Sequence, residues 1–65
     1  MMIQTLNALG FTLTDQDEAN IQYTRGLIDV FFQSDGKVIL AYASNEVIEI
    51  KDSTHLEKMI EALSY

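Results

Sequence analysis

Hydrophobic residues recur at helical spacing at the N-terminal end of the chain. Met2, Ile3, Leu6 and Leu9 fall on one face of a short helix. Gly10 follows directly, and glycine is the usual residue where a helix ends in the left-handed conformation. The pattern therefore predicts a helix that ends at Gly10.

A second helix is expected at the C-terminal end. Thr54 and Glu57 have the spacing of a capping box, with Asp52 and Ser53 as competing caps. The residues that follow form one apolar stripe at helical spacing: Leu56, Met59, Ile60 and Leu63.

Between these helices, apolar runs of strand length are separated by turn residues. The turns are expected at Arg25-Gly26, Asp35-Gly36 and Ser44-Asn45, of which Asp-Gly is the strongest hairpin pattern. Four antiparallel strands follow from them, at 20–25, 27–33, 37–43 and 46–51. The conformation of residues 11–19 is left open between strand, helical turn and loop.

Two-residue turns fix which residues face each other. They place Phe32 opposite Ile39 and Ala41 opposite Ile48, and facing residues point to the same side of a sheet. One side then collects ten uncharged residues: Ile21, Tyr23, Ile28, Val30, Phe32, Ile39, Ala41, Ala43, Ile48 and Ile50. We expect this side to be the core, covered by both helices. The predicted fold is a single α+β domain over residues 1–65, with two layers in the order α-β-β-β-β-α and a four-stranded antiparallel meander.

The opposite side of the predicted sheet mixes apolar and acidic residues. Exposed apolar patches with a polar rim mark interaction sites, and Tyr and Phe are enriched in interface cores. The expected protein interface consists of Leu27, Asp29, Phe31, Val38, Leu40, Tyr42, Val47 and Glu49. Three occupants are open: another protein, a second copy of the chain, or residues 11–19 folded across the face with Phe11 and Leu13.

The charge argues against polyanionic partners. Ten Asp and Glu stand against four Lys and Arg, so the net charge is −6. Phosphate backbones and anionic lipids are held by clustered Lys and Arg, and the four basic residues are scattered. Direct binding to nucleic acid or to a membrane is not expected. The chain also lacks Cys, a signal-peptide pattern and an apolar run of the ~18 residues that a membrane span needs, so we expect a cytoplasmic protein.

Three acidic residues lie close together at Asp15, Asp17 and Glu18. A calcium loop beginning at Asp15 would need an oxygen ligand at position 5 and a bidentate Glu at position 12, where this chain has Ala19 and Gly26. We therefore expect a solvated connector, which either supplies an acidic rim to the interface or serves solubility alone. The lone His55 has no nearby Cys or second His, so neither a metal nor a cofactor is expected.

These patterns predict a small acidic, non-enzymatic binding module of adaptor or inhibitor type, acting on another protein or as a homodimer. The alternative is an inhibitor that imitates nucleic acid. Compact acidic anti-CRISPR proteins with a helix–meander–helix order are similar in size, charge and element order, which would imply a phage or mobile-element origin. The phosphate surrogates would be Asp15, Asp17, Glu18, Glu46, Glu49, Asp52, Glu57 and Glu61.

Overall fold

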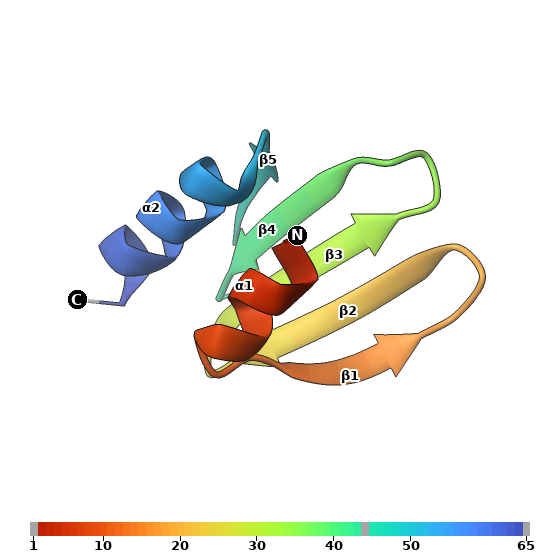
Figure 1. Cartoon of the computed structure of the whole chain (residues 1–65), viewed down its shortest axis with the longest axis horizontal. Coiled ribbons are helices and arrows are strands. Elements are labelled where there is room, and N and C mark those ends of the chain that lie inside the picture. The colour runs from red at the N-terminus through yellow and green to blue at the C-terminus, as the bar shows by residue number, and fades with distance from the viewer. Residues whose placement is uncertain (1, 44, 65) are drawn as a thin grey trace.

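The computed structural model describes residues 2–43 and 45–64 of the chain. Two helices flank five strands in the sequence, so the chain is an α+β protein, as predicted (Figure 1). The elements are α1 Met2–Ala8, β1 Thr12–Gln16, β2 Asn20–Arg25, β3 Ile28–Gln33, β4 Val38–Tyr42, β5 Glu46–Ile50 and α2 Ser53–Leu63.

The end of α1 confirms the expected glycine cap. Gly10 has a φ of 87°, in the left-handed region. The backbone N–H of Phe11 donates to the carbonyl of Leu6 at 3.0 Å, and that of Gly10 donates to the carbonyl of Asn7 at 3.2 Å. This is the double hydrogen bond of a Schellman motif, which usually brings a hydrophobic contact with it. Phe11 and Leu6 are both buried in the core accordingly.

Helix α2 begins two residues earlier than a cap at Thr54 would require. Asp52 is the N-cap, and its carboxylate accepts a hydrogen bond from the backbone N–H of His55 at 2.8 Å. Of the competing caps, the aspartate therefore prevails over Thr54. The buried residues of this helix are Leu56 and Ile60, which belong to the predicted stripe.

The sheet has five antiparallel strands in the order β1-β2-β3-β4-β5, so the predicted four-stranded meander was wrong by one strand. The additional strand is β1, in the segment whose conformation the sequence left open. It pairs with β2 through an irregularity between Leu13 and Asp15. Every residue of β1 is exposed, so the segment extends the sheet at its edge and does not fold across a face.

The pairing of β2 with β3 differs by two residues from the expected one, which leaves the sides unchanged. Tyr23 pairs with Val30, and Ile21 pairs with Phe32. The turn consists of Gly26 and Leu27, since Arg25 pairs with Ile28.

Strand β4 has the opposite orientation to the predicted one. Val38 pairs with Phe32, and Leu40 pairs with Val30, so these residues share the buried side with Val30. The cause is the hairpin loop, which contains three residues instead of two. Gln33 donates its N–H to the carbonyl of Lys37 at 2.9 Å, and Gly36 has a φ of 90°. A three-residue loop that ends in a left-handed glycine is a common hairpin connection.

The next connection is also longer than predicted by one residue. Tyr42 pairs with Glu46, which leaves 43–45 between them; Ser44 of the predicted Ser44-Asn45 turn lies outside the described residues. The one-residue shift in this loop cancels the one-residue shift in the loop before β4. Ile48 and Ile50 consequently return to the buried side, as predicted, opposite Leu40 and Val38.

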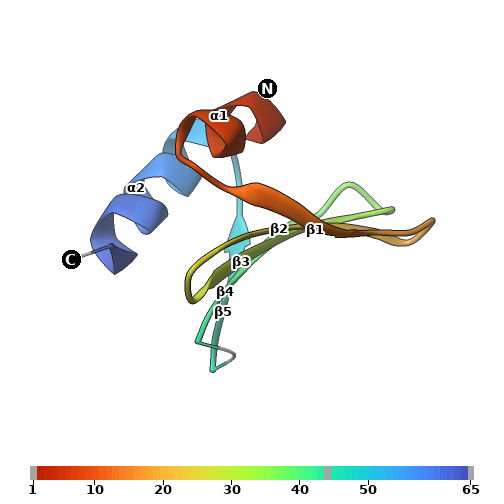
Figure 2. The same cartoon turned by 90° about the horizontal axis from the view of Figure 1, so that it is seen from below.

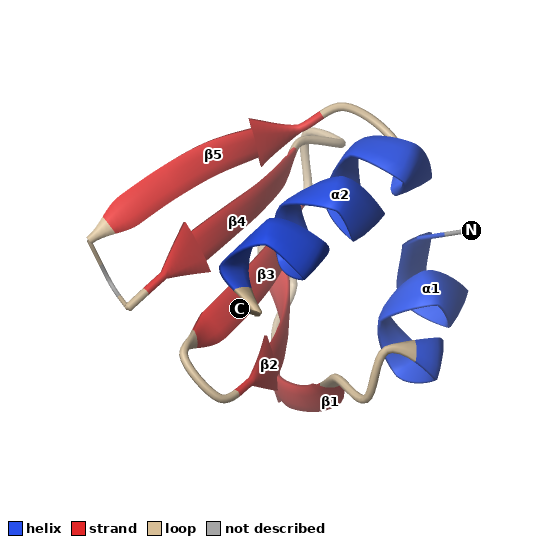
Figure 3. Cartoon of the chain, turned by 90° about the vertical axis from the view of Figure 1, so that its left-hand side faces the viewer, coloured by secondary structure: helices blue, strands red, loops and turns tan. Residues whose placement is uncertain are grey.

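One hydrophobic cluster holds the fold together. Its members come from both helices, the segment after α1 and the strands: Leu6, Phe11, Tyr23, Ile28, Val30, Val38, Leu40, Ile50, Leu56 and Ile60. The expectation that both helices cover one face of the sheet is not quite matched. α1 and α2 lie beside each other near one end of the twisted sheet and are not laid flat across its middle (Figures 1 and 3).

Candidate functional site

The candidate site is the outer face of the sheet, which we define as the side opposite the buried cluster. Successive residues of a strand point to opposite sides, and cross-strand partners point to the same side. With Val30 and Leu40 in the core, the central part of the outer face consists of Asp29, Phe31, Ile39, Ala41, Val47 and Glu49. We call these six residues the outer-face grid.

The grid has two rows across three strands. Asp29, Ala41 and Val47 form one row, since Ala41 pairs with both neighbours. Phe31, Ile39 and Glu49 form the other, through Ile39. The two carboxylates therefore occupy diagonal corners, and four apolar residues lie between them. With strands ~4.8 Å apart and a rise of ~3.4 Å per residue, their Cα atoms are separated by about 12 Å.

The apolar part of the grid is accessible. Val47 is 67% exposed. Phe31, Ile39 and Ala41 are each half-buried, although they have no place in the buried cluster or in the shell packed against it. An apolar patch with a polar rim on an otherwise covered domain is typical of an interaction surface.

Asp29 is held in place by a hydrogen-bond chain on the same face. Its Oδ1 accepts from the Thr24 hydroxyl at 2.7 Å and from Gln22 Nε2 at 3.2 Å. The Thr14 and Thr24 hydroxyls are 2.9 Å apart. Because the single proton of Thr24 goes to the carboxylate, Thr24 is the acceptor in that contact, and the single proton of Thr14 is shared between Thr24 and the Gln22 carbonyl, 3.3 Å away. Strand β1 thereby steadies the side chain of β3 across β2.

The structure places some of the residues predicted for the interface on the outer face and others in the core. Asp29, Phe31, Val47 and Glu49 are on the outer face, as expected. Val38 and Leu40 are not: they are 7% and 0% exposed and belong to the core. Tyr42 packs against that core too. These three residues were misplaced because the hairpin loop before β4 contains one residue more than predicted.

Two residues of the grid were missed for the same reason. Ile39 and Ala41 were assigned to the core and lie on the outer face. Side-chain volume could have identified the error, since the competing trio of Val38, Leu40 and Tyr42 fills a core better than Ile39, Ala41 and Ala43 do.

Leu27 and Leu13 are exposed apolar residues outside the grid. Leu27 is in the β2–β3 turn and is 62% exposed. Leu13 is 49% exposed and pairs with Tyr23, which places it on the buried side of the edge strand. Neither residue covers the grid, and Phe11 is buried in the core, so the structure does not match the alternative in which residues 11–19 fold across this face.

In the predicted acidic rim, Asp15 and Asp17 accept hydrogen bonds from the backbone of nearby residues. Asp17 Oδ1 accepts hydrogen bonds from the backbone N–H groups of Ala19 and Asn20 at 2.8 and 2.7 Å. Asp15 Oδ1 accepts from the N–H of Gln16 at 2.9 Å. Asp15 also pairs with Gln22, so it belongs to the outer face, where Gln22 of β2 separates it from Phe31 of the grid. Glu18 is exposed in the turn that joins β1 to β2. The three residues are thus brought to one end of the hairpin, and strand pairing places only Asp15 on the outer face.

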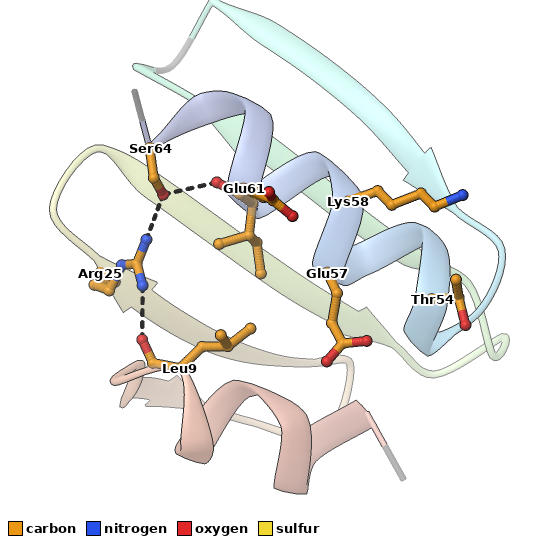
Figure 4. A pocket seen from close by; sticks show the side chains of 8 residues that line it. Leu9, Arg25, Thr54, Glu57, Lys58, Glu61 and Ser64 are labelled. Carbon is orange, nitrogen blue, oxygen red and sulfur yellow. Dashed lines mark hydrogen bonds between the residues drawn. The ribbon is translucent and has the colours of Figure 1, made fainter.

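Arg25 anchors the helices to the sheet. Its guanidinium donates from Nη1 to the carbonyl of Leu9 at 2.7 Å and from Nη2 to the hydroxyl of Ser64 at 2.6 Å (Figure 4). The same group lies 5.2 Å from the ring centroid of Phe11. These contacts join the C-terminal ends of both helices, where the helix dipole favours a cation.

A pocket of about 570 Å³ lies next to this anchor, and Figure 4 shows its lining. Leu9 and Ile60 provide apolar surface, while Glu57 and Glu61 of α2 provide carboxylates. The guanidinium of Arg25 in this pocket donates hydrogen bonds to Leu9 and Ser64, and these bonds hold the helices to the sheet. A second pocket, of about 430 Å³, is lined by apolar residues of α1 and the sheet together with Lys51, Asp52 and Ser53.

The lone histidine has a structural role at the start of α2. His55 Nδ1 accepts a hydrogen bond from the backbone N–H of Lys51 at 3.1 Å, which fixes the start of α2. Among residues 2–43 and 45–64, no group of three His, Asp or Glu side chains is placed to hold a metal ion. Within the same residues, neither helix combines the length and the apolar character that crossing a membrane requires.

Comparisons of the chain with models of known protein families, with curated proteins and with solved structures find no significant match.

Proposed function

We propose that this protein is a small, non-enzymatic binding module that engages another protein through the outer-face grid. One observation carries the proposal: Phe31, Ile39, Ala41 and Val47 form an accessible apolar patch on the side of the sheet opposite the core. Aromatic and aliphatic residues in the centre of a polar-rimmed patch are the usual source of binding energy in protein interfaces.

The proposal requires that both helices pack on the buried side of the sheet and do not cover the grid. It is supported by the burial of Leu6 from α1 in the same cluster as Leu56 and Ile60 from α2. The positions of α1 and α2 relative to the edge-on sheet in Figure 2 support it as well. A sheet face without such a cover needs either polar side chains or a partner.

The experiment compares two double variants of the full chain. Phe31→Ser with Val47→Ser removes apolar side chains from the grid, and Leu13→Ser with Leu27→Ser removes two that are exposed elsewhere. We measure association by sedimentation velocity and by quantitative mass spectrometry of proteins that copurify from the source cell. The grid variant should lose association while its circular dichroism stays unchanged.

The control variant should associate as the original chain does. If the grid variant assembles normally and the control does not, the interface lies on the other side of the sheet and the proposal is wrong. Sedimentation also distinguishes the two kinds of partner, because a homodimer sediments as a dimer when the protein is alone.

The nucleic-acid mimic stays a prediction with a test of its own. A mimic competes with DNA or RNA for a basic cleft, and its binding weakens steeply with salt. The patch proposed above instead loses affinity when Phe31 is replaced, at any salt concentration.

A further inference from the structure

The charged residues that strand pairing places on the outer face are all acidic; the nearest cation along β4 is the exposed Lys37, directly before that strand. The carboxylates of the outer face are Asp15, Asp29 and Glu49. The five strands contain a single basic residue, Arg25, and its guanidinium is bound to Leu9 and Ser64 near the buried Phe11. The grid therefore offers apolar surface between negative charges with no cation of its own among the strands.

Asp29 is prepared to receive a cation. Thr24 and Gln22 both donate to Oδ1, which fixes the orientation of the carboxylate. In the described part of the chain, no hydrogen bond reaches the other oxygen, Oδ2. The carboxylate is half-buried beside Phe31, so a charge-assisted bond to Oδ2 forms where water screens it only partly.

This charge pattern favours one kind of partner for the grid over the others. A second copy packed face to face brings carboxylates and apolar residues against carboxylates, and like charges in an interface cost several kcal/mol. A phosphate backbone is repelled for the same reason. A protein segment with basic side chains satisfies both carboxylates and covers the apolar residues between them.

We propose that the outer-face grid binds a cationic segment of a different protein, with one basic side chain at Asp29, another at Glu49 and apolar side chains packed on Phe31 and Ile39. The inference rests on the proposed function and names the partner's chemistry. The carboxylates are separated by about 12 Å, a distance that an extended segment spans with basic residues about four positions apart.

The test selects peptides from a library of random 12-residue sequences displayed on phage, with the full chain immobilised. Selected peptides should carry Lys or Arg about four positions apart with apolar residues between them. Their affinities are then measured by fluorescence anisotropy for the original chain, Asp29→Asn and Glu49→Gln. Two further variants, Asp35→Asn and Glu57→Gln, remove carboxylates outside the outer face.

Asp29→Asn should weaken binding about tenfold, because it keeps the shape of the side chain and removes its charge. Glu49, which is exposed, should contribute severalfold. The two control variants should bind as the original chain does, and affinity should fall as salt rises. Neutral or acidic selected peptides, no selected peptide, or equal affinity for Asp29→Asn would each overturn the inference.

The Phe31→Ser and Val47→Ser variant separates the two levels of failure. If neutral peptides are selected and this variant loses them, the grid is a binding surface and only the cationic partner is wrong. If the variant retains the selected peptides, the grid is not the binding surface, and the proposed function is wrong too.

Discussion

The two faces of the sheet use the same five strands for different purposes. On the buried side, Val30 and Leu40 are fully enclosed and every contributing side chain is apolar. On the outer side, Phe31 and Ile39 pair across the same two strands but stay half-buried between carboxylates. Neighbouring residues along one strand thus belong to environments that differ in solvent access and charge.

This difference separates what stabilises the domain from what is free to act. A domain of this size buries only about 60% of the surface that its unfolded chain exposes, so it has little stability to spare. The half-buried apolar residues of the outer face contribute less to that stability than the enclosed core residues do. Their position between Asp29 and Glu49 is the feature on which the proposed binding surface rests.

The largest effect is expected from a pair of neighbours on β4. Leu40→Ala removes a fully buried side chain and should cost about 2–5 kcal/mol of unfolding free energy. Ile39→Ala, on the outer face, should cost about 1 kcal/mol. Urea unfolding followed by circular dichroism measures both. The opposite order would mean that β4 has the two-residue-turn register, and that the grid does not exist.

A smaller loss is expected when the helices are detached from the sheet. Arg25→Met keeps the apolar stem but removes the bonds to Leu9 and Ser64, so stability should fall by about 1–3 kcal/mol. The matched control is Lys58→Met on the exposed side of α2, which should have little effect. Because the outer face does not contact Arg25, peptide binding to the folded variant should be unchanged. Equal losses for the two variants would show that the anchor contributes nothing specific.

Next in size is the cap of α2. Asp52→Ala should destabilise the domain by about 1 kcal/mol, since it removes the acceptor for the His55 N–H. Thr54→Ala should change stability by only a few tenths of a kcal/mol if the helix begins at Ser53. Thermal unfolding at fixed pH distinguishes them, and a larger loss for Thr54→Ala would place the cap there instead.

The smallest effect on stability is expected at the most exposed position of the grid. Val47→Thr preserves the branched shape at a side chain that is 67% exposed, so the unfolding free energy should change by no more than about 0.5 kcal/mol. The same substitution should lower peptide affinity, because it introduces a hydroxyl into the apolar patch. A loss of stability without a change in affinity would assign Val47 to the fold.

Periodicity predicted the helices, and together with the expected turns it predicted the sides of most strands. Leu6, Leu56 and Ile60 were expected to be buried and are, and Gly10 ends α1 as glycine patterns indicate. These features depend on short-range spacing within one segment. The fifth strand was not predicted, because β1 is exposed at every position and has no hydrophobic alternation to reveal it.

The orientation of β4 could not be predicted from the turn residues. Asp35-Gly36 fits a two-residue turn, whereas the chain uses Ser34 as well and places Gly36 at the left-handed end of a three-residue loop. A displacement of one residue moves a whole strand to the other face. The second longer loop restored β5, so only the strand between the two loops was wrong.

The residues of the grid were therefore predicted only in part. Asp29, Phe31, Val47 and Glu49 could be predicted because β3 and β5 were oriented correctly. Ile39 and Ala41 required the loop length, which depends on backbone conformation more than on residue type. The hydrogen-bond chain from Thr14 to Asp29 required the fifth strand and could not be inferred without it.

The strand order also bears on how the chain reaches its native state. Each strand pairs only with its neighbours in the sequence, so hairpins can form one after another without closing long loops, and a low contact order favours rapid folding. Longer-range contacts are made by the two helices, which touch each other, and by the bond from Arg25 to Ser64, which spans 39 residues. Docking of the helices, which closes the core with Leu6, Leu56 and Ile60, therefore depends on contacts between residues far apart in the sequence.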